Sequence, residues 1–244
     1  MKLNNEIVLV TGANRGLGRA LVEAALAAGA RRVYATARDP QQLAGLVAGA
    51  SGRVVPLALD ITDERSLVAA AEQALDVSVL INNAGVVASH GVLTSSVAGL
   101  TQDFATNVFG TLAATKAFLP ALQRAGAQGR AAVVNVLSVV SLANMPALGG
   151  YSASKAAAAS ITEALRSDLA KSNISVHGVF AGAMDTDMTR DMQMPKARPE
   201  DVARAIIDGL EQGADDIFPD AMAQGAFATW RGDPKELARQ LASM

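Results

Sequence analysis

Cysteine is absent from the 244 residues of the chain. Its absence excludes disulfide bonds, thiol catalysis and metal sites built on cysteine, and it is compatible with a reducing compartment. Charged residues make up only 18% of the sequence, and the net charge is −2 with both signs interspersed. The sequence therefore has no basic patch of the kind that would predict binding to nucleic acid or to a membrane surface.

Long hydrophobic runs are also missing. No segment approaches the roughly 18 uninterrupted apolar residues that a membrane-spanning helix needs. Residues 1–6 are polar and do not resemble a signal peptide, which begins with a basic and then an apolar stretch. Half of the residues are hydrophobic, which is enough for a large core. We expect a cytoplasmic globular protein that uses neither a membrane nor nucleic acid as partner.

Short apolar runs alternate with longer helical patterns along the chain. We expect strands at 6–11, 32–36, 54–59, 77–81, 131–137, 175–180 and 216–218. We expect helices at 16–29, 41–48, 63–74, 101–124, 151–171, 200–212 and 234–241. This alternation is typical of βαβ units. It predicts an α/β fold with a doubly wound, Rossmann-type, mostly parallel seven-stranded sheet and helices on both faces.

No proline-rich or low-complexity linker divides the sequence, which predicts a single domain over residues 1–244. Two segments have weaker patterns. Residues 186–199 are rich in Met, Asp and charge, and we expect them to form a mobile substrate loop. Residues 221–244 are expected to form a C-terminal tail with one short helix.

A glycine-rich turn, from Thr11 to Gly18, joins the first expected strand to the first helix. Glycines suit such a turn because they permit positive φ and let the backbone approach a pyrophosphate closely. The N–H groups of the following helix can then bind the phosphates. An ordinary strand-to-helix turn is the alternative interpretation. The predicted cofactor contacts of this turn are Gly12, Asn14, Arg15, Gly16, Leu17 and Gly18.

The end of the second strand indicates which dinucleotide binds. An acidic residue there would bind the adenosine ribose and repel a 2′-phosphate. The sequence instead has Arg38, and Arg15 in the glycine turn can reach the same group. Guanidinium groups pair well with phosphate oxygens, although either arginine alone is equally well explained as a surface charge. Together they favour NADP(H) over NAD(H).

Tyr151 and Lys155 lie four residues apart at the start of an expected helix and therefore share one face. A nearby ammonium favours the phenolate and lowers the pKa of a tyrosine. Such a pair can act as an acid and base, but it also occurs by chance.

Further motifs surround this pair in a fixed order. They are the glycine turn, Asp60 after the third strand, Asn82-Asn83-Ala84-Gly85 after the fourth, Asn107 in the next helix, and Ser138 thirteen residues before Tyr151. In this set the chain resembles the short-chain dehydrogenases/reductases, in their compact single-domain branch. The match runs from about Val8 to Phe218.

The resemblance implies catalytic roles for four residues. Tyr151 would exchange a proton with the substrate oxygen, and Ser138 would hydrogen-bond to that oxygen. Lys155 would bind the nicotinamide ribose and lower the pKa of Tyr151. Asn107 would hold a water that links Lys155 to solvent. The implied enzyme transfers a hydride between NADP(H) and a carbonyl or secondary alcohol, as a carbonyl reductase does, and needs no metal.

The resemblance also implies cofactor contacts beyond the glycine turn and the arginine. These are Asp60, Ile61, Asn83, Ala84, Gly85, Tyr151, Lys155, Gly182, Ala183 and Thr186. One departure stands out, because Ala181 replaces the proline that usually precedes Gly182 in this family. The loss of a fixed φ predicts a looser turn at the nicotinamide.

Three variable stretches, 86–93, 139–150 and 184–194, are expected to wall the substrate pocket. An apolar, adaptable wall suits a hydrophobic aldehyde or ketone. The methionines of these stretches are equally well explained as residues that pack beneath a helix. His90, the one histidine in these loops, is better explained as a solvated side chain. The candidate pocket residues are His90, Leu142, Met145, Leu148, Met184 and Met188.

Two other functions share these motifs. A catalytically silent NADP(H)-binding regulatory protein is one, but the intact Ser138–Tyr151–Lys155 set argues against it. An epimerase or dehydratase is the other, but such enzymes usually carry a larger C-terminal substrate domain. Four consecutive alanines, 156–159, follow Lys155. Since members of the family commonly pair this helix across a dimer, we expect a homodimer or homotetramer.

Overall fold

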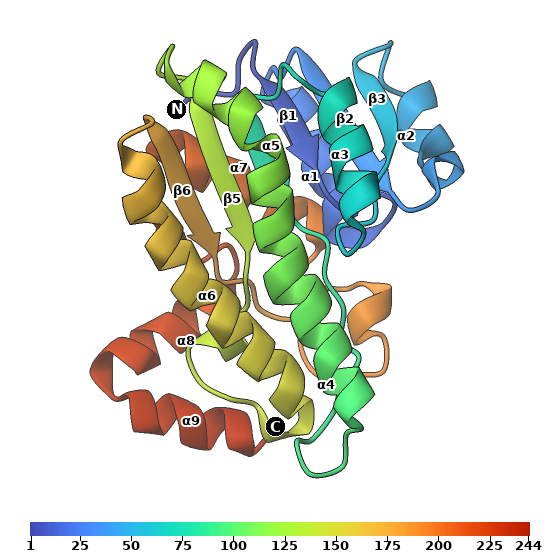
Figure 1. Cartoon of the computed structure of the whole chain (residues 1–244). Coiled ribbons are helices and arrows are strands. Elements are labelled where there is room, and N and C mark those ends of the chain that lie inside the picture. The colour runs from blue at the N-terminus through green and yellow to red at the C-terminus, as the bar shows by residue number, and fades with distance from the viewer.

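A seven-stranded, fully parallel sheet forms the centre of the computed structural model, which describes all 244 residues (Figure 1). The strand order is β3-β2-β1-β4-β5-β6-β7, so the direction of winding reverses between β1 and β4. This confirms the predicted doubly wound α/β fold in a single domain. The strands are β1 (Ile7–Val10), β2 (Arg32–Ala37), β3 (Val54–Ala58), β4 (Val79–Asn82), β5 (Ala131–Val136), β6 (Ile174–Val179) and β7 (Asp216–Ile217).

Helices cover both faces of the sheet, in two separate core clusters. Helices α1, α2 and α7 pack on one face, and α3, α5 and α6 pack on the other, nearer the viewer in Figure 1. The helices are α1 (Gly16–Ala27), α2 (Ala44–Ala48), α3 (Glu64–Gln73), α4 (Val97–Phe104), α5 (Thr111–Gly126), α6 (Gly149–Ala170), α7 (Pro199–Gln212), α8 (Ala221–Gly232) and α9 (Pro234–Ala242).

Strand β1 shows why these apolar runs form a buried sheet. All four of its residues are buried. Val8 and Val10 contribute to the cluster under α1, whereas Ile7 and Leu9 contribute to the cluster under α5. Successive side chains of a strand point to opposite faces, so a strand covered on both sides must be apolar throughout.

The helix expected at 101–124 begins earlier and is interrupted. Its first residue is Val97, because the Ser96 hydroxyl caps the N-terminus by accepting a hydrogen bond from the Gly99 N–H at 3.1 Å. A π-helical segment, Ala105–Gly110, joins α4 to α5. Such wide turns are rare and often lie at functional sites.

The C-terminal tail is more ordered than its sequence pattern indicates. Helix α9 was expected, but α8 was not. Both pack against the segment after β5, in a third cluster that includes Val139, Val140 and Met145. The tail therefore closes the molecule beneath the carboxyl end of β6 (Figure 1).

The segment expected as a substrate loop contains one short 3₁₀ turn, Asp187–Thr189, and is tied back by a bridge between Met184 and Ala197. Its mobility stays a prediction. None of the helices combines the length and apolar character that crossing a bilayer requires.

Candidate active site

A cavity of about 580 Å³ lies at the carboxyl ends of the strands, where the order of the sheet reverses. Ligands of open α/β sheets bind at such switch points. Every residue that the sequence analysis predicts as a cofactor contact lines this cavity. Residues that are distant in the sequence, from Gly12 to Thr186, thus form one continuous wall.

The glycine turn has the geometry of a cradle for phosphates. Gly12 has φ +66°, and a Cβ there would lie 3.0 Å from the Cα of Ala84. A Cβ on Gly18 would lie 2.1 Å from the carbonyl oxygen of Gly12, closer than any real contact. No side chain caps the N-terminus of α1. Its N–H groups and its dipole therefore face the cavity in a form that suits an anion.

The segment after β4 locks this turn in place. The Asn83 side chain donates hydrogen bonds to the carbonyl oxygens of Thr11 at 2.9 Å and Gly12 at 3.1 Å. The backbone N–H groups of Asn83 and Ala84 both donate to the Thr11 hydroxyl at 2.9 Å. In this structure Asn83 therefore shapes the turn, in addition to lining the cavity.

Arg15 and Arg38, the two arginines that the sequence analysis singled out, both line the cavity. Hydrogen bonding from Thr62 lowers the pKa of Asp60, and the charge of the exposed Arg38 side chain contributes in the same direction. The Arg15 guanidinium is already paired, since its Nη1 lies 2.7 Å from Oδ2 of Asp187 on the expected substrate loop. This pair is largely exposed and therefore weak.

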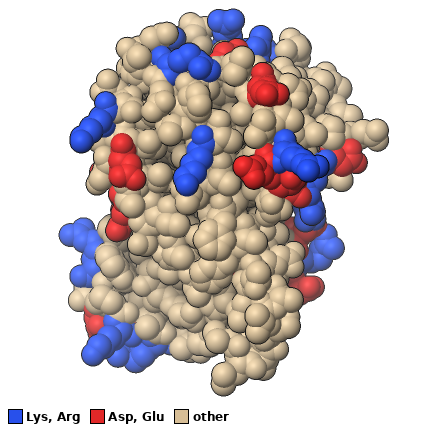
Figure 2. Space-filling view, in the orientation of Figure 1, with Lys and Arg blue, Asp and Glu red and all other residues tan.

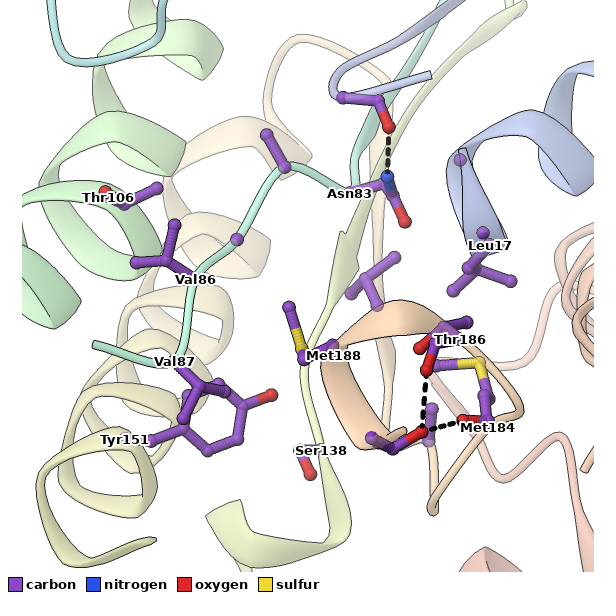
Figure 3. A pocket seen from close by; sticks show the side chains of 18 of the residues that line it. Leu17, Asn83, Val86, Val87, Thr106, Ser138, Tyr151, Met184, Thr186 and Met188 are labelled. Atoms are coloured by element: carbon purple, nitrogen blue, oxygen red, sulfur yellow. Dashed lines mark hydrogen bonds between the residues drawn. The ribbon is translucent and has the colours of Figure 1, made fainter. Parts of the chain in front are cut away.

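Tyr151 and Ser138 lie close together in the cavity, away from Leu17 of the glycine turn (Figure 3), and Lys155 lines the same cavity. The tyrosine and lysine project from the start of α6, and Ser138 follows β5. The Lys155 ammonium donates to the Val136 carbonyl oxygen at 2.8 Å and lies 5.8 Å from the centroid of the Tyr151 ring. The backbone N–H of Ser138 donates to Ser141 Oγ at 3.3 Å. Ser141 thus fixes Ser138, a role that the sequence did not reveal.

Burial dominates the acid–base properties of this pair. It raises the pKa of Tyr151 to about 12, although hydrogen bonding with Ser138 opposes the rise. Lys155 was expected to lower the pKa of Tyr151, but it makes no such contribution in this structure. Burial also lowers the pKa of Lys155 to about 8, and its ammonium bonds a backbone carbonyl. Desolvation disfavours both charged forms, so the phenol holds its proton at neutral pH.

Asn107 lies behind the cavity wall, in the π-helical segment, and is buried. Its Oδ1 accepts the Val86 N–H at 2.9 Å. Its Nδ2 donates to the Val86 carbonyl oxygen at 2.9 Å and to Ser154 Oγ at 3.0 Å. The side chain therefore ties the segment after β4 to α6. Its predicted bound water stays a prediction.

Four of the six predicted substrate residues line the cavity: Met145, Leu148, Met184 and Met188. The other two do not. His90 is exposed on a loop, where its backbone N–H donates to Ser95 Oγ at 2.7 Å. Leu142 packs towards the C-terminal helices and Phe218, because the 3₁₀ turn after Ser138 directs it away.

The turn that lacks the usual proline is held by the unpredicted helix α8. The Gly182 N–H donates to the Asp220 carboxylate at 2.8 Å, and the Ala183 N–H points to the Met222 sulfur at 3.4 Å. Asp220 also caps α8 through the Ala223 N–H. The looser turn expected from Ala181 is therefore compensated by contacts from the tail.

Residues 6–197 match the family model of short chain dehydrogenases. An uncharacterized oxidoreductase, YusZ of Bacillus subtilis, is 34% identical over 194 residues, which are 76% of this chain and 68% of the relative. The chain therefore belongs to the short-chain dehydrogenase/reductase family and is an oxidoreductase.

Solved structures agree with this assignment. A short-chain dehydrogenase from Burkholderia cenocepacia, crystallised with NADP, is 38% identical over 99% of both chains with a TM-score of 0.91. A 3-ketoacyl-(acyl-carrier-protein) reductase from Brucella melitensis, in complex with NADH, is 25% identical with a TM-score of 0.79 and covers 91% of this chain and 93% of its own. The two structures thus contain different dinucleotides.

Proposed function

We propose that this protein is an NADP(H)-dependent reductase of hydrophobic aldehydes or ketones, with Tyr151 as proton donor. The observation that carries the proposal is the placement of Tyr151, Ser138 and Lys155 at one end of a cavity whose other end is the glycine turn. A bound nicotinamide supplies the hydride. The protein supplies orientation and the proton.

Each polar group at this end has a defined task. The Tyr151 hydroxyl donates its proton to the carbonyl oxygen of the substrate, or accepts one from an alcohol in the reverse direction. The Ser138 hydroxyl donates a hydrogen bond to the same oxygen and holds the carbonyl in place. The Lys155 ammonium binds ribose hydroxyls and stabilises the phenolate that remains.

The dinucleotide fits the other end. The glycine turn and the N-terminus of α1 would hold the pyrophosphate, and Asp60 the adenine. Arg38 carries the preference for NADP(H), because it is free to pair with a 2′-phosphate. Arg15 would contribute after exchanging Asp187 for that phosphate.

The methionines support an apolar substrate. The chain has eight methionines, and all except the terminal Met1 and Met244 line the cavity: Met145, Met184, Met188, Met192, Met194 and Met222. In Figure 3 Met188 faces the same space as Tyr151 and Ser138. Thioether side chains are apolar and flexible, so they adapt to substrates of varied shape. The wall offers no arginine at this end to bind an anionic substrate.

A substrate panel tests this proposal. We expect the protein to consume NADPH with apolar aldehydes and ketones, and to prefer NADPH over NADH by about tenfold or more, because hydrogen bonds to a charged group are strong. Matched carbonyls that carry a carboxylate should react at least tenfold more slowly, because burying an unpaired charge is costly. Equal use of the charged and uncharged members would contradict the apolar pocket. Better use of NADH would contradict the role of Arg38.

The assembly is part of the proposal, together with a cytoplasmic location. Figure 2 shows a broad area without charged side chains in the lower part of the view, where Figure 1 places α4 and the first half of α6. Phe109, between α4 and α5, is 63% exposed, and the small residues Ala153 and Ala156 of α6 are exposed as well. Exposed apolar patches mark interfaces. We expect two or four copies of the 25.0 kDa chain to associate, and light scattering that finds only single chains would reject this expectation.

A further inference from the structure

One buried charge near the site has no ion-pair partner. The Asp103 side chain, near the end of α4, is completely buried, and no basic group lies within ion-pair distance of it. A carboxylate removed from water is costly unless hydrogen bonds compensate. A buried charge without an ion-pair partner, placed beside a reaction site, is a candidate for a specific function.

The segment after β4 supplies the compensation. Asp103 Oδ1 accepts the Ala88 N–H at 2.8 Å, and Oδ2 accepts the Ser89 N–H at 3.2 Å. The Ser89 hydroxyl also donates to Oδ2. Ser89 is itself buried. Three donors of one short segment thus converge on a single carboxylate.

Asp103 acts together with Asn107, which lies one helical turn later on the same face. Asn107 hydrogen-bonds to both the N–H and the carbonyl oxygen of Val86, and Asp103 accepts the N–H groups of Ala88 and Ser89. Between them runs the stretch that carries Val86 and Val87 along the cavity wall, next to Tyr151 (Figure 3).

This clamp also touches the start of α6. A Cβ on Gly150 would lie 2.2 Å from Ser89 Oγ, so Ser89 packs directly against the residue before Tyr151. Displacement of Ser89 would therefore disturb the backbone from which the Tyr151 side chain projects. Asp103 of α4 thus holds the segment after β4, and Ser89 of that segment packs against α6.

The charge of Asp103 also acts on the reacting groups. Burial is the largest influence on both pKa values, raising that of Tyr151 and lowering that of Lys155, and the Asp103 charge acts in addition to raise the pKa of each. The segment after β4 carries one other ionisable side chain, His90, and α6 carries Tyr151 and Lys155 in its first two turns. The remaining ionisable residues of α6, Glu163, Arg166 and Asp168, lie at least two helical turns beyond Lys155. Because no arginine shields the carboxylate, its field favours the protonated forms of the pair.

We propose that Asp103 is a positioning residue of the active site, which clamps residues 86–89 beside Tyr151 and supplies a fixed negative charge to the Tyr151–Lys155 pair. It touches neither substrate nor cofactor. The proposal rests on the function proposed above, because it assigns Asp103 to the same reaction.

The Asp103→Asn variant tests it. The amide is nearly isosteric, but it removes the charge and sets its NH₂ group against the N–H donors. We expect kcat for carbonyl reduction to fall on the order of tenfold, because small misplacements of reacting groups are costly. Loss of the negative charge lowers the pKa of both Tyr151 and Lys155, so the alkaline limb of the pH–rate profile should move to lower pH.

A matched variant separates the charge from the packing. Ser89→Ala removes one hydrogen bond but retains the carboxylate, so it should reduce kcat less and leave the alkaline limb in place. Should Asp103→Asn match the wild type in kcat and pH profile, the proposal is wrong. It is also wrong if Ser89→Ala shifts the profile equally, because the charge would then have no separate effect.

A titration gives a readout that does not need activity. The chain has two tyrosines, Tyr34 and Tyr151, so a Tyr34→Phe background leaves only Tyr151 to follow by tyrosinate absorbance. Adding Asp103→Asn should bring tyrosinate formation to lower pH in protein that circular dichroism shows to be folded. An unchanged titration overturns the proposal for Asp103 alone. Inactivity of the wild type on all carbonyls would instead count against the proposed function.

Discussion

The Tyr151→Phe variant is expected to lose at least about 100-fold in kcat for carbonyl reduction while it binds NADP(H) as tightly as the wild type. General acid catalysis by a positioned side chain contributes roughly 10²- to 10⁴-fold. Burial raises the pKa of Tyr151 to about 12, so the hydroxyl is protonated at neutral pH and ready to donate. The substitution removes only that hydroxyl. Steady-state kinetics and NADPH fluorescence titration measure the two quantities.

The second tyrosine provides a matched control. The Tyr34 hydroxyl donates to Asp76 at 2.8 Å and is not part of the cavity wall. Tyr34→Phe is therefore the same chemical change outside the site, and we expect it to leave kcat unchanged. If Tyr151→Phe retained a tenth or more of the wild-type kcat, another group would have to supply the proton.

The Gly18→Ala variant is expected to lose measurable NADP(H) binding. The added methyl would lie 2.1 Å from the Gly12 carbonyl oxygen and 2.6 Å from the Asn83 side chain. Backbone cannot yield as a flexible side chain does, so the turn must open and its N–H groups must leave the phosphates. Calorimetric titration with NADP measures the loss, and thermal unfolding verifies that the variant is folded.

Gly225 of α8 supplies the control for this substitution. No atom lies within 4 Å of a Cβ built there. Gly225→Ala adds the same methyl inside a helix, where alanine is the more favourable residue, so binding should be unchanged and stability equal or higher. Wild-type affinity in a folded Gly18→Ala variant would show that the turn does not cradle the cofactor.

Much of the fold follows from local sequence pattern. Apolar runs such as Ile7–Val10 are strands because both sheet faces are covered, and their alternation with helices dictates parallel connections. Helix α8 escaped prediction because its pattern of Ala, Gly and Gln lacks a clear polar face. The early start of α4 depended on the Ser96 cap, which a run of small polar residues conceals.

The candidate site also combines residues that local sequence pattern predicts with residues that it does not. The residues predicted to contact the cofactor line one cavity, because turns at strand ends carry their own sequence signals and those ends converge in a parallel sheet. Residues that act through tertiary contacts were not. Asp103 stands in an ordinary polar stretch, and only the folded chain brings Ser89 to it. Asp220 holds Gly182 across 38 positions, and His90 failed as a pocket residue because its loop points outward.

Transfer of deuterium from labelled NADPH tests the central claim most directly. The protein would be incubated with a reactive ketone and NADPH that carries deuterium at the hydride-donating carbon, in each of its two orientations in turn. The account predicts that one of the two labels appears on the carbinol carbon of the product, in proportion to NADPH consumed and only when Tyr151 is present. Tight binding of NADPH without label transfer to any carbonyl would contradict the account and favour a catalytically silent binding protein. Epimerised substrate without net consumption of NADPH would contradict it in favour of an epimerase.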